Sequence, residues 1–313
     1  MKRWLWFILL IVGFMAVFYF LIPVSASVSC QVLLHGNART VYRSFTSARL
    51  LEKWWVSKSQ ARTEKKEIIV SEGACHFTIA PDPFNVVSIR MECRKKPVQT
   101  YLTMLPLMQD STAVIWKANV QNERGLFARI QNYFEARAVK KDMQRVLEQL
   151  QQFLQSSKGI YDLPINQENV TGTLLVVTRL RDTVLPNPAT YYGLLHSLRQ
   201  YIAAQGAQEI NYPMLNVSET DTSQYEIMVA IPINKKVPDK GAILFKRMLA
   251  DKLLVAEVMG GPAMIEDGFA EMELYMNEHN LKAAGRSFQL LITDRLAEKD
   301  TAKWRTKLYY PLL

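Results

Sequence analysis

Residues 225–234 read YEIMVAIPIN, and residues 303–313 read KWRTKLYYPLL. Each run is strand-like and ends on an apolar or aromatic residue, a proline and a further apolar residue. Pro232 and Pro311 lie 79 positions apart. This spacing predicts that the C-terminal part of the chain contains one structural unit twice.

The segments around these two runs support the repeat, because each half predicts the element order β-α-β-β. The first strands are expected at 171–182 and 240–260, the helices at 188–206 and 261–280, and the second strands at 211–219 and 287–295. Each helix carries an apolar face at helical spacing. Those faces contain Tyr192, Leu195, Leu198 and Ile202 in the first half and Ile265, Phe269, Met272, Tyr275 and Met276 in the second.

This pattern resembles the GyrI-like domain, which is the effector-binding domain of AraC- and MerR-type regulators, over residues 171–313. The resemblance rests on YEIMVAIPI in the first half and on GGPAMIEDGFAEMELYMNEHN and KWRTKLYYPL in the second. It implies two pseudo-symmetric units that form a concave sheet with a small-molecule pocket at the centre.

The resemblance also implies which residues line that pocket. Many family members carry a glutamate in the penultimate strand and a tyrosine two residues later, where this chain has Gln289 and Leu291. We expect Gln289 and Tyr309 to point into the concavity, with Tyr192 and Met228 contributed by the first half. A glutamine forms hydrogen bonds but supplies no charge. The site is therefore expected to be neutral, to prefer uncharged, flat or apolar ligands, and not to be catalytic.

Residues 1–27 predict a membrane anchor. The stretch WLWFILLIVGFMAVFYFLIPV at 4–24 has no charged side chain, and about 20 apolar residues cross a bilayer as a helix. Lys2 and Arg3 precede the stretch, and the next charge is Arg39. The positive-inside rule then predicts a single pass through the inner (plasma) membrane, a cytoplasmic N-terminus and an extracytoplasmic body. Cleavage within PVSASVSC, after the apolar run, is the alternative.

Residues 28–157 predict a strand, a short helix, an antiparallel sheet and one long closing helix. Asn37 is the predicted N-cap of the short helix. Strands are expected at 65–73, 74–80, 85–93, 99–108 and 112–120, and the closing helix at 125–155. A helix of about 30 residues needs a large apolar surface to lie against, and the sheet supplies it.

That order resembles the START/polyketide-cyclase-like (SRPBCC) superfamily, in which a curved sheet grips a long C-terminal helix. The resemblance rests on the element order, on RSFTSARLLEKWW at 43–55 and on VKKDMQRVLEQLQQFL at 139–154. It implies an apolar ligand between sheet and helix, with Trp54, Trp55, Trp116 and Tyr133 as candidates to line the space. The alternative is that these aromatic side chains fill the core. The order of the two domains behind a membrane helix also resembles a known bacterial combination.

Residues 158–170 contain Gly, Pro and Asn without periodicity and are predicted to be a linker. The charge balance changes near the same point: residues 1–170 contain 22 Lys/Arg and 13 Asp/Glu, whereas residues 171–313 contain 16 of each. Such a change supports two separate soluble domains. The predicted fold class is therefore α+β.

Cys75 and Cys93 flank the turn sequence PDPFN. A hairpin centred near Phe84 would place them opposite each other, so a disulfide or two buried thiols are both compatible with the pattern. The chain has three cysteines, and an odd number does not make a disulfide framework. The sequence therefore favours two buried thiols.

No catalytic or metal-binding motif is present in the sequence. The four histidines are scattered, and the metal-site and phosphate-loop patterns are missing. We therefore expect a non-catalytic, membrane-anchored protein that binds or senses a small apolar or aromatic ligand, without cofactor, metal or nucleic acid. Neither the ligand nor any protein partner is specified. Two alternatives stay open: a structural or interaction module with filled pockets, and a hydrolase or cyclase that uses the SRPBCC-like cavity.

Overall fold

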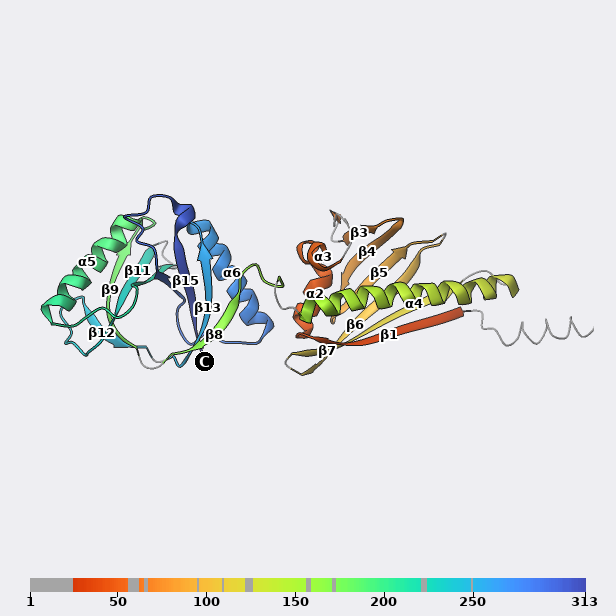
Figure 1. Cartoon of the computed structure of the whole chain (residues 1–313), viewed down its shortest axis with the longest axis horizontal. Helices are drawn as coiled ribbons and strands as arrows, with labels where there is room; N and C mark the ends of the chain where they lie inside the picture. Colours follow the sequence, from red (N-terminus) through yellow and green to blue (C-terminus); the bar gives the residue numbers. More distant parts are fainter. Residues whose placement is uncertain are drawn as a thin grey trace, which may run out of the picture. The chain divides into compact units, whose positions relative to one another are not determined.

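The computed structural model describes residues 25–55, 62–64, 67–94, 96–108, 110–121, 126–155, 159–170, 173–220, 224–248 and 250–313. Within them the chain is a mixed α+β protein with two antiparallel sheets and five α-helices (Figure 1). It divides into two compact units, Met1–Ile160 and Tyr161–Leu313. The expected membrane span at 4–24 lies outside the described residues, and within those residues no helix has the length and apolar character to cross a membrane.

The first unit is a seven-stranded sheet with the strand order β1-β7-β6-β5-β4-β3-β2. The N-terminal strand therefore forms one edge and pairs with the last strand. The strands are β1 (Ser25–His35), β2 (Arg62–Glu64), β3 (Glu67–Glu72), β4 (Cys75–Asp82), β5 (Val86–Glu92), β6 (Val98–Met108) and β7 (Ser111–Gln121).

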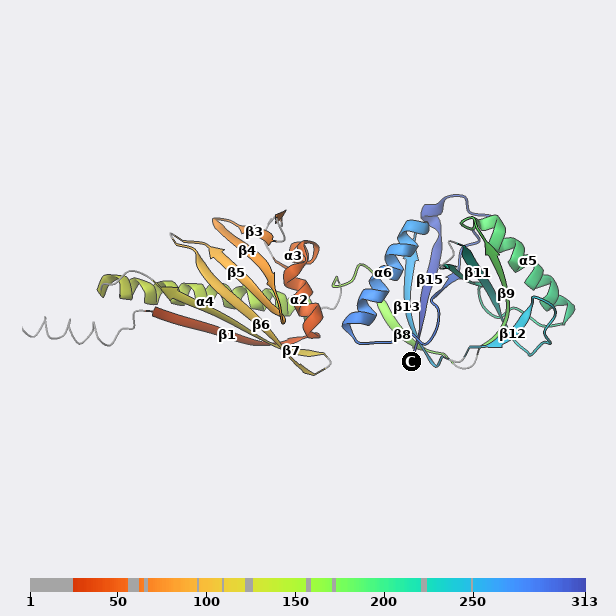
Figure 2. The same cartoon turned by 180° about the vertical axis from the view of Figure 1, so that it is seen from behind.

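The described residues of this unit form three helices: α2 (Ala38–Thr46), α3 (Ala48–Trp54) and α4 (Leu126–Gln155). Asn37 is the N-cap of α2, as predicted, and its Oδ1 accepts the Thr40 N–H at 2.9 Å. The short helix is split at Ser47, because this residue has extended backbone and caps α3. Helix α4 lies across one face of the sheet, in front of the strands in Figure 1 and behind them in Figure 2.

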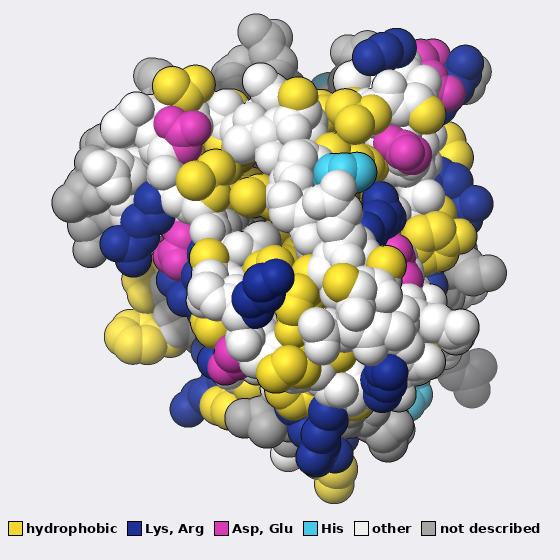
Figure 3. Space-filling view, turned by 90° about the vertical axis from the view of Figure 1, so that its left-hand side faces the viewer, with side chains coloured by type: hydrophobic (Ala, Val, Ile, Leu, Met, Phe, Trp, Pro, Cys, Tyr) yellow, Lys and Arg dark blue, Asp and Glu magenta, His cyan; other side chains and the backbone are white. Residues whose placement is uncertain are grey.

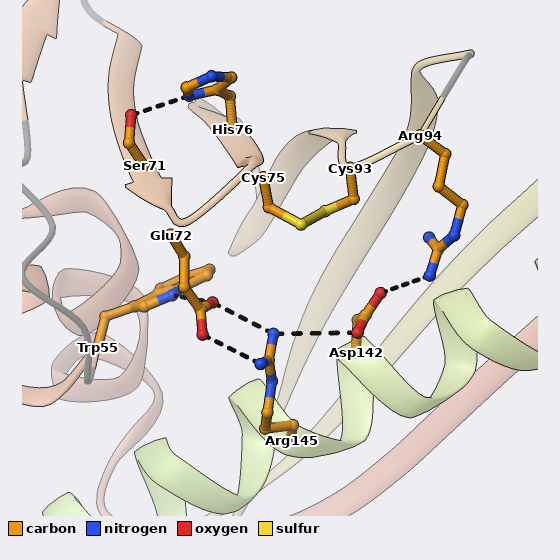
Figure 4. Close-up of a disulfide and its surroundings, with 9 residues drawn as sticks. All are labelled: Trp55, Ser71, Glu72, Cys75, His76, Cys93, Arg94, Asp142 and Arg145. Carbon is orange, nitrogen blue, oxygen red and sulfur yellow. Dashed lines mark hydrogen bonds and ion pairs between the residues drawn. A yellow bond between two sulfur atoms is a disulfide. The ribbon is translucent and has the colours of Figure 1, made fainter.

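Cys75 and Cys93 form a disulfide (Figure 4), so the expectation of two buried thiols is wrong. The β4–β5 turn has positive φ at Phe84 and Asn85, and the ladder that follows ends with His76 opposite Glu92. The Cα atoms of the two cysteines thus lie 4.1 Å apart. Register decides whether two cysteines can bond, and the cysteine count of the chain does not.

An ion-pair network beside the disulfide joins α4 to the sheet (Figure 4). Arg145 lies 3.1 Å from Glu72 on β3, and Asp142 lies 2.8 Å from Arg94. Glu72 also accepts the indole N–H of Trp55 at 3.3 Å. Each charged group in the network is paired with one of opposite sign. The network therefore has a structural role, because it holds α4 against the sheet.

The second unit is an eight-stranded antiparallel sheet with the order β12-β9-β11-β10-β14-β15-β13-β8. Its helices are α5 (Pro188–Ala204) and α6 (Pro262–Glu278). Its strands are β8 (Ile165–Asn169), β9 (Leu174–Asp182), β10 (Met214–Glu219), β11 (Tyr225–Ile233), β12 (Leu244–Arg247), β13 (Lys252–Met259), β14 (Phe288–Leu291) and β15 (Arg305–Leu312).

The two halves of this unit have the same order, β9-α5-β10-β11 and β13-α6-β14-β15. In the sheet the first half is arranged β9-β11-β10 and the second half β14-β15-β13. The strand order of the second half is therefore the reverse of that of the first, and the two halves are related by a pseudo-two-fold axis between β10 and β14. This arrangement is the repeat that the spacing of Pro232 and Pro311 predicts.

Two segments differ from expectation. Residues 240–260 are not one strand, because β12 pairs with β9 whereas β13 pairs with β15. Part of the expected linker forms β8, which pairs with β13 at the edge of the sheet. An edge strand needs only main-chain pairing on one side, so a segment without apolar alternation can still form one.

Both helices pack on the same face of the sheet. The register places Leu215 opposite Gln289, and Gln289 opposite Leu308, so these three residues share one face. Leu215 packs in the α5 core, and Leu308 packs in the α6 core. We call this the helix face. The second face carries a separate apolar cluster that contains Met214 and Tyr309.

One face of the second unit carries charges of both signs. On the face seen in Figure 3, Lys and Arg side chains (dark blue) and Asp and Glu side chains (magenta) are interspersed among hydrophobic ones (yellow).

Candidate functional site

A cleft of ≈ 420 Å³ lies on the helix face of the second unit, between the start of α5 and the first half of α6. The central strands contribute Leu215 and Val217 of β10 and Gln289 of β14. The α6 wall combines apolar side chains such as Ile265 and Phe269 with the carboxylates of Glu266 and Glu273. We call this space the interhelical cleft. Both halves of the repeat form it, and it lies at the pseudo-symmetric centre of the unit.

Arg295 places a guanidinium in the lining of this cleft, although only 6 % of the residue is exposed. Its Nη2 donates to Gln289 Oε1 and to Thr306 Oγ1, both at 2.9 Å. Its Nη1 lies 3.5 Å from the Tyr191 hydroxyl. The guanidinium carbon lies 4.7 Å from the centroid of the Trp304 ring, which is within the range of a cation–π contact.

All of these partners are neutral. Within the described part of the chain, no Asp or Glu side chain forms an ion pair with Arg295. The expectation of a neutral site, drawn from Gln289 alone, is therefore corrected. The sequence gives no signal for Arg295, because this residue lies in an irregular loop after β14 and only the return of the chain into β15 brings it back to Gln289.

Two tyrosine hydroxyls border the cleft. Tyr310 donates to Glu273 at 2.6 Å, and burial, followed by this hydrogen bond, raises the pKa of Tyr310 to about 12. Burial also raises the pKa of Tyr191, against the opposing effect of the hydrogen bond from Arg295. Both phenols are protonated at neutral pH and are suited to hydrogen bonding rather than to proton transfer.

Of the expected pocket residues in the second unit, Gln289 lines the interhelical cleft. Leu291 and Tyr192 border a separate, more open hollow of ≈ 500 Å³ beside α5. Leu291 is also part of the α5 core. The Tyr192 hydroxyl accepts the backbone N–H of Arg295 at 2.9 Å, so Tyr192 positions the loop that carries the guanidinium.

The expectation that Gln289 and Tyr309 point into one concavity is wrong. Gln289 pairs with Leu308, so the alternation of a strand places Tyr309 on the opposite face. There its ring stacks on Phe288 with the centroids 5.0 Å apart. The tyrosine on the cleft side is Tyr310.

Met228 also lies on the second face, where it lines an apolar groove of ≈ 380 Å³ with Met214, Met248 and Phe288. The prediction of a shared pocket fails for Met228 for the same reason as for Tyr309. The periodicity of a strand shows which residues share a face, but only the register between strands shows which faces coincide. The roles of these residues in ligand binding stay predictions.

The three tryptophans expected to line a cavity in the first unit instead fill its core. Trp54, Trp55 and Trp116 are 2 %, 1 % and 0 % exposed. Each indole N–H is hydrogen-bonded: Trp54 donates to Ser44 O at 2.9 Å and Trp116 to Thr100 Oγ1 at 2.8 Å, while Trp55 donates to Glu72. These three residues therefore fill the core, which was the alternative to lining a ligand cavity.

Tyr133 does not face the interior. It is 58 % exposed, and its ring contacts that of Phe134 on the surface of α4. The buried stripe of α4 runs through Ala136, Val139 and Met143, and Tyr133 lies off this stripe. The expectation that Tyr133 lines a cavity between sheet and helix is therefore corrected. In the described ranges, no three His, Cys, Asp or Glu side chains gather as they would around a metal ion.

The sequence matches no protein-family profile and no curated protein. Similar solved structures include the C-terminal domain of EcmrR, at 12% identity over 49% of this chain and 98% of that chain, with a TM-score of 0.41. A START superfamily protein from Mycobacterium smegmatis has 12% identity over 42% of this chain and 99% of that chain, with a TM-score of 0.32. A protein solved bound to tetraphenylphosphonium has 13% identity over 48% and 94%, with a TM-score of 0.35. Likenesses of this size are coarse, so function has to follow from the residues of the chain itself.

Proposed function

We propose that this chain is a non-catalytic protein that binds or senses a small molecule, and that the ligand occupies the interhelical cleft. The observation that carries the proposal is the cleft itself, ≈ 420 Å³ in volume. It combines apolar walls such as Ile265 and Phe269 with the polar groups Gln289, Arg295 and Tyr310. Concave, mostly apolar sites with a few convergent polar groups are typical of small-molecule pockets.

The proposal places the ligand in the second unit rather than the first. Of the tryptophans expected to line a cavity in the first unit, Trp54 and Trp55 pack against each other with ring centroids 5.2 Å apart, and Trp116 is fully buried. Their indole N–H groups are already satisfied. This packing supports a scaffold role for the first unit.

A non-catalytic role is favoured by the chemistry of the cleft. General acid–base catalysis needs groups whose pKa values lie near the working pH. The pKa of Tyr310 lies at about 12, and its partner Glu273 is engaged with the phenol. Arg295 is held by Gln289 and Thr306, which suits recognition of a ligand.

We further propose that residues 4–24 anchor the chain in the membrane and that both units lie outside the cytoplasm. The disulfide between Cys75 and Cys93 supports this placement, because disulfides persist in oxidising compartments. Protease added to intact spheroplasts should remove both units. Full protection of the chain would reverse the proposed orientation.

Native mass spectrometry of the full chain, purified from its own membrane in mild detergent, tests the binding role. We expect a retained small molecule that is lost in Val217→Trp, because a large ring at Val217 fills the cleft. Met259→Trp is the matched control, because Met259 is 62 % exposed. A chain that never retains a molecule, or that retains it equally in Val217→Trp, would contradict the proposal.

A further inference from the structure

The buried guanidinium of Arg295 points to the class of ligand. We infer that the interhelical cleft takes an aromatic or apolar molecule that carries a carboxylate, and that Arg295 binds this group. The inference rests on the proposed function, since it names the chemistry of the ligand in the same cleft.

The first argument is the cost of the buried charge. A buried cation is strongly unfavourable unless a counter-charge or several hydrogen bonds compensate it. Arg295 is 6 % exposed, and its partners Gln289, Thr306 and Tyr191 are neutral. The protein therefore compensates the hydrogen-bonding capacity of this side chain only in part, and among the described residues its charge meets the face of the Trp304 ring but no carboxylate at ion-pair distance. A ligand carboxylate would supply the missing negative charge.

The second argument is the number of donors that remain. A guanidinium has five N–H donors. Nη2 makes two hydrogen bonds of 2.9 Å, whereas Nη1 makes one contact of 3.5 Å. Within the described residues, Nε of Arg295 makes no hydrogen bond. Nε and Nη1 thus retain the capacity to bind carboxylate oxygens, and such charge-assisted bonds are the strong ones.

The third argument is that the guanidinium is held in place. Gln289 on β14 and Thr306 on β15 both accept hydrogen bonds from Nη2. The centroid of the Trp304 ring lies 4.7 Å from the guanidinium carbon. A pre-positioned guanidinium loses less conformational entropy when it binds an anion. The start of α6 adds to the positive potential, because Pro262 lines the cleft and the N-cap Gly261 offers no side chain to the first-turn N–H groups.

Two carboxylates on the α6 wall oppose this potential. Glu266 and Glu273 both line the cleft, and both are exposed to solvent. Glu273 also accepts the Tyr310 hydroxyl. Water and salt screen charges at exposed positions such as these two carboxylates, and they screen the buried charge of Arg295 much less. Asp294 Oδ1 accepts the backbone N–H of Leu296 at 2.9 Å, so Asp294 shapes the loop rather than pairing with the guanidinium.

Three probes of the same shape test the inference: 2-naphthoate, 2-naphthamide and naphthalene-2-carboxamidine. They are titrated by isothermal calorimetry into the full chain in non-ionic detergent, with detergent alone as the blank. The wild type should bind the naphthoate about ten- to hundredfold more tightly than the amide. The amidinium should bind most weakly.

Two variants remove the positive charge from the cleft in different ways. Arg295→Met deletes the guanidinium, and Gln289→Glu gives it a carboxylate partner within the protein. Both should bring the ratio of naphthoate to naphthamide affinity close to one. Arg305→Met is the control, because Arg305 pairs with Glu257 outside the cleft and its loss removes the same formal charge. This control should keep the wild-type ratio.

The outcomes separate the two proposals. If the three probes bind equally, if the amidinium binds most tightly, or if a folded Arg295→Met keeps the naphthoate preference, the carboxylate inference is wrong and ligand binding stands. If no probe binds the wild type and native mass spectrometry finds no retained molecule, the proposed function itself fails. If Arg295→Met does not fold, the wild-type comparison and Gln289→Glu still decide the inference.

Discussion

Arg295, in the loop that joins β14 to β15, donates a hydrogen bond from Nη2 to Gln289 Oε1 on β14 at 2.9 Å. The amide orients the guanidinium without neutralising it. A glutamate at the same position would convert this hydrogen bond into a buried ion pair. The chemistry of the interhelical cleft therefore depends on the pair of residues rather than on either one.

This coupling predicts how the charge preference of the cleft can be reversed. Gln289→Glu alone should gain little affinity for naphthalene-2-carboxamidine, because Arg295 neutralises the new carboxylate. The double variant Gln289→Glu/Arg295→Met leaves that carboxylate without a cation and should bind the amidinium about ten- to hundredfold more tightly than the wild type. Calorimetric titration of both single variants and the double variant completes the cycle. Additive effects of the two substitutions would show that the residues are not coupled.

The disulfide predicts a measurable share of the stability of the first unit. Cys75 and Cys93 are 18 positions apart, and in the chain-entropy treatment a bridge over a loop of this size contributes about 3 kcal/mol. Replacing both cysteines with alanine should lower the free energy of unfolding in urea by that amount. Cys30→Ala, at the free buried thiol, leaves the bridge intact as the control.

Thiol alkylation checks the pairing directly. The denatured, unreduced chain should carry one reactive thiol at Cys30, and reduction should add the other two. Three reactive thiols before reduction would refute the bridge in the protein as isolated.

We expect the stability of the first unit to depend on a buried hydrogen bond between Trp116 and Thr100. Thr100 accepts the Trp116 N–H at 2.8 Å and donates to Ile89 O at 2.7 Å, and both Thr100 and Trp116 are 0 % exposed. Thr100→Val leaves the buried indole N–H without a partner and should cost about 1–3 kcal/mol of unfolding free energy. Thr103→Val, half-buried on the same strand, should be near neutral. A neutral Thr100→Val would indicate that water reaches Trp116, and it would reopen the case for a cavity in this unit.

We expect the two helices of the second unit to respond differently to a glycine-to-alanine substitution. An alanine Cβ at Gly268 of α6 would lie 2.6 Å from Leu308 Cδ1 and 2.8 Å from Val258 Cγ1, whereas one at Gly193 of α5 meets nothing within 4 Å. Gly193→Ala should stabilise by about 0.5–1 kcal/mol through helix propensity. Gly268→Ala should instead destabilise by about 1–3 kcal/mol through overpacking. Thermal unfolding of both variants tests the contrast, and equal signs would contradict the packing of α6 on its strands.

We expect the stability of the second unit to decrease at acid pH because of Glu226. The hydrogen bond from Arg286 at 3.0 Å holds the pKa of Glu226 below its ordinary value of 4.5, aided by the charge of Arg179 and opposed by burial. The folded pKa is the lower one. This contribution to stability is therefore present above the ordinary carboxyl pKa and is lost as pH falls through the folded value.

Unfolding free energies measured from neutral to acid pH test this assignment. Glu226→Gln should flatten the acid limb of the profile, whereas Glu219→Gln, at an exposed position on the neighbouring strand, should leave it unchanged. An acid limb that is identical in Glu226→Gln and in the wild type would rule out this source of the pH dependence.

The sequence by itself determined the order of the elements. Periodicity and turn residues were enough for the β-α-β-β repeat around Pro232 and Pro311, for the N-cap at Asn37 and for the long helix that became α4, because these features depend on local spacing and local hydrogen bonds. It also placed Gln289 on a central strand. The anchor predicted at 4–24 stays a prediction, since it lies outside the described residues.

Only the tertiary structure decided which residues meet. The register between strands placed Tyr310 rather than Tyr309 on the same face as Gln289 and brought Cys75 next to Cys93. It also made part of the expected linker the edge strand β8. The loop between β14 and β15 placed Arg295 in contact with Gln289 and Thr306 on these two central strands. Such contacts arise from long-range pairing between strands, and a shift of one residue changes the face of every side chain that follows. Periodicity within one segment does not contain this information.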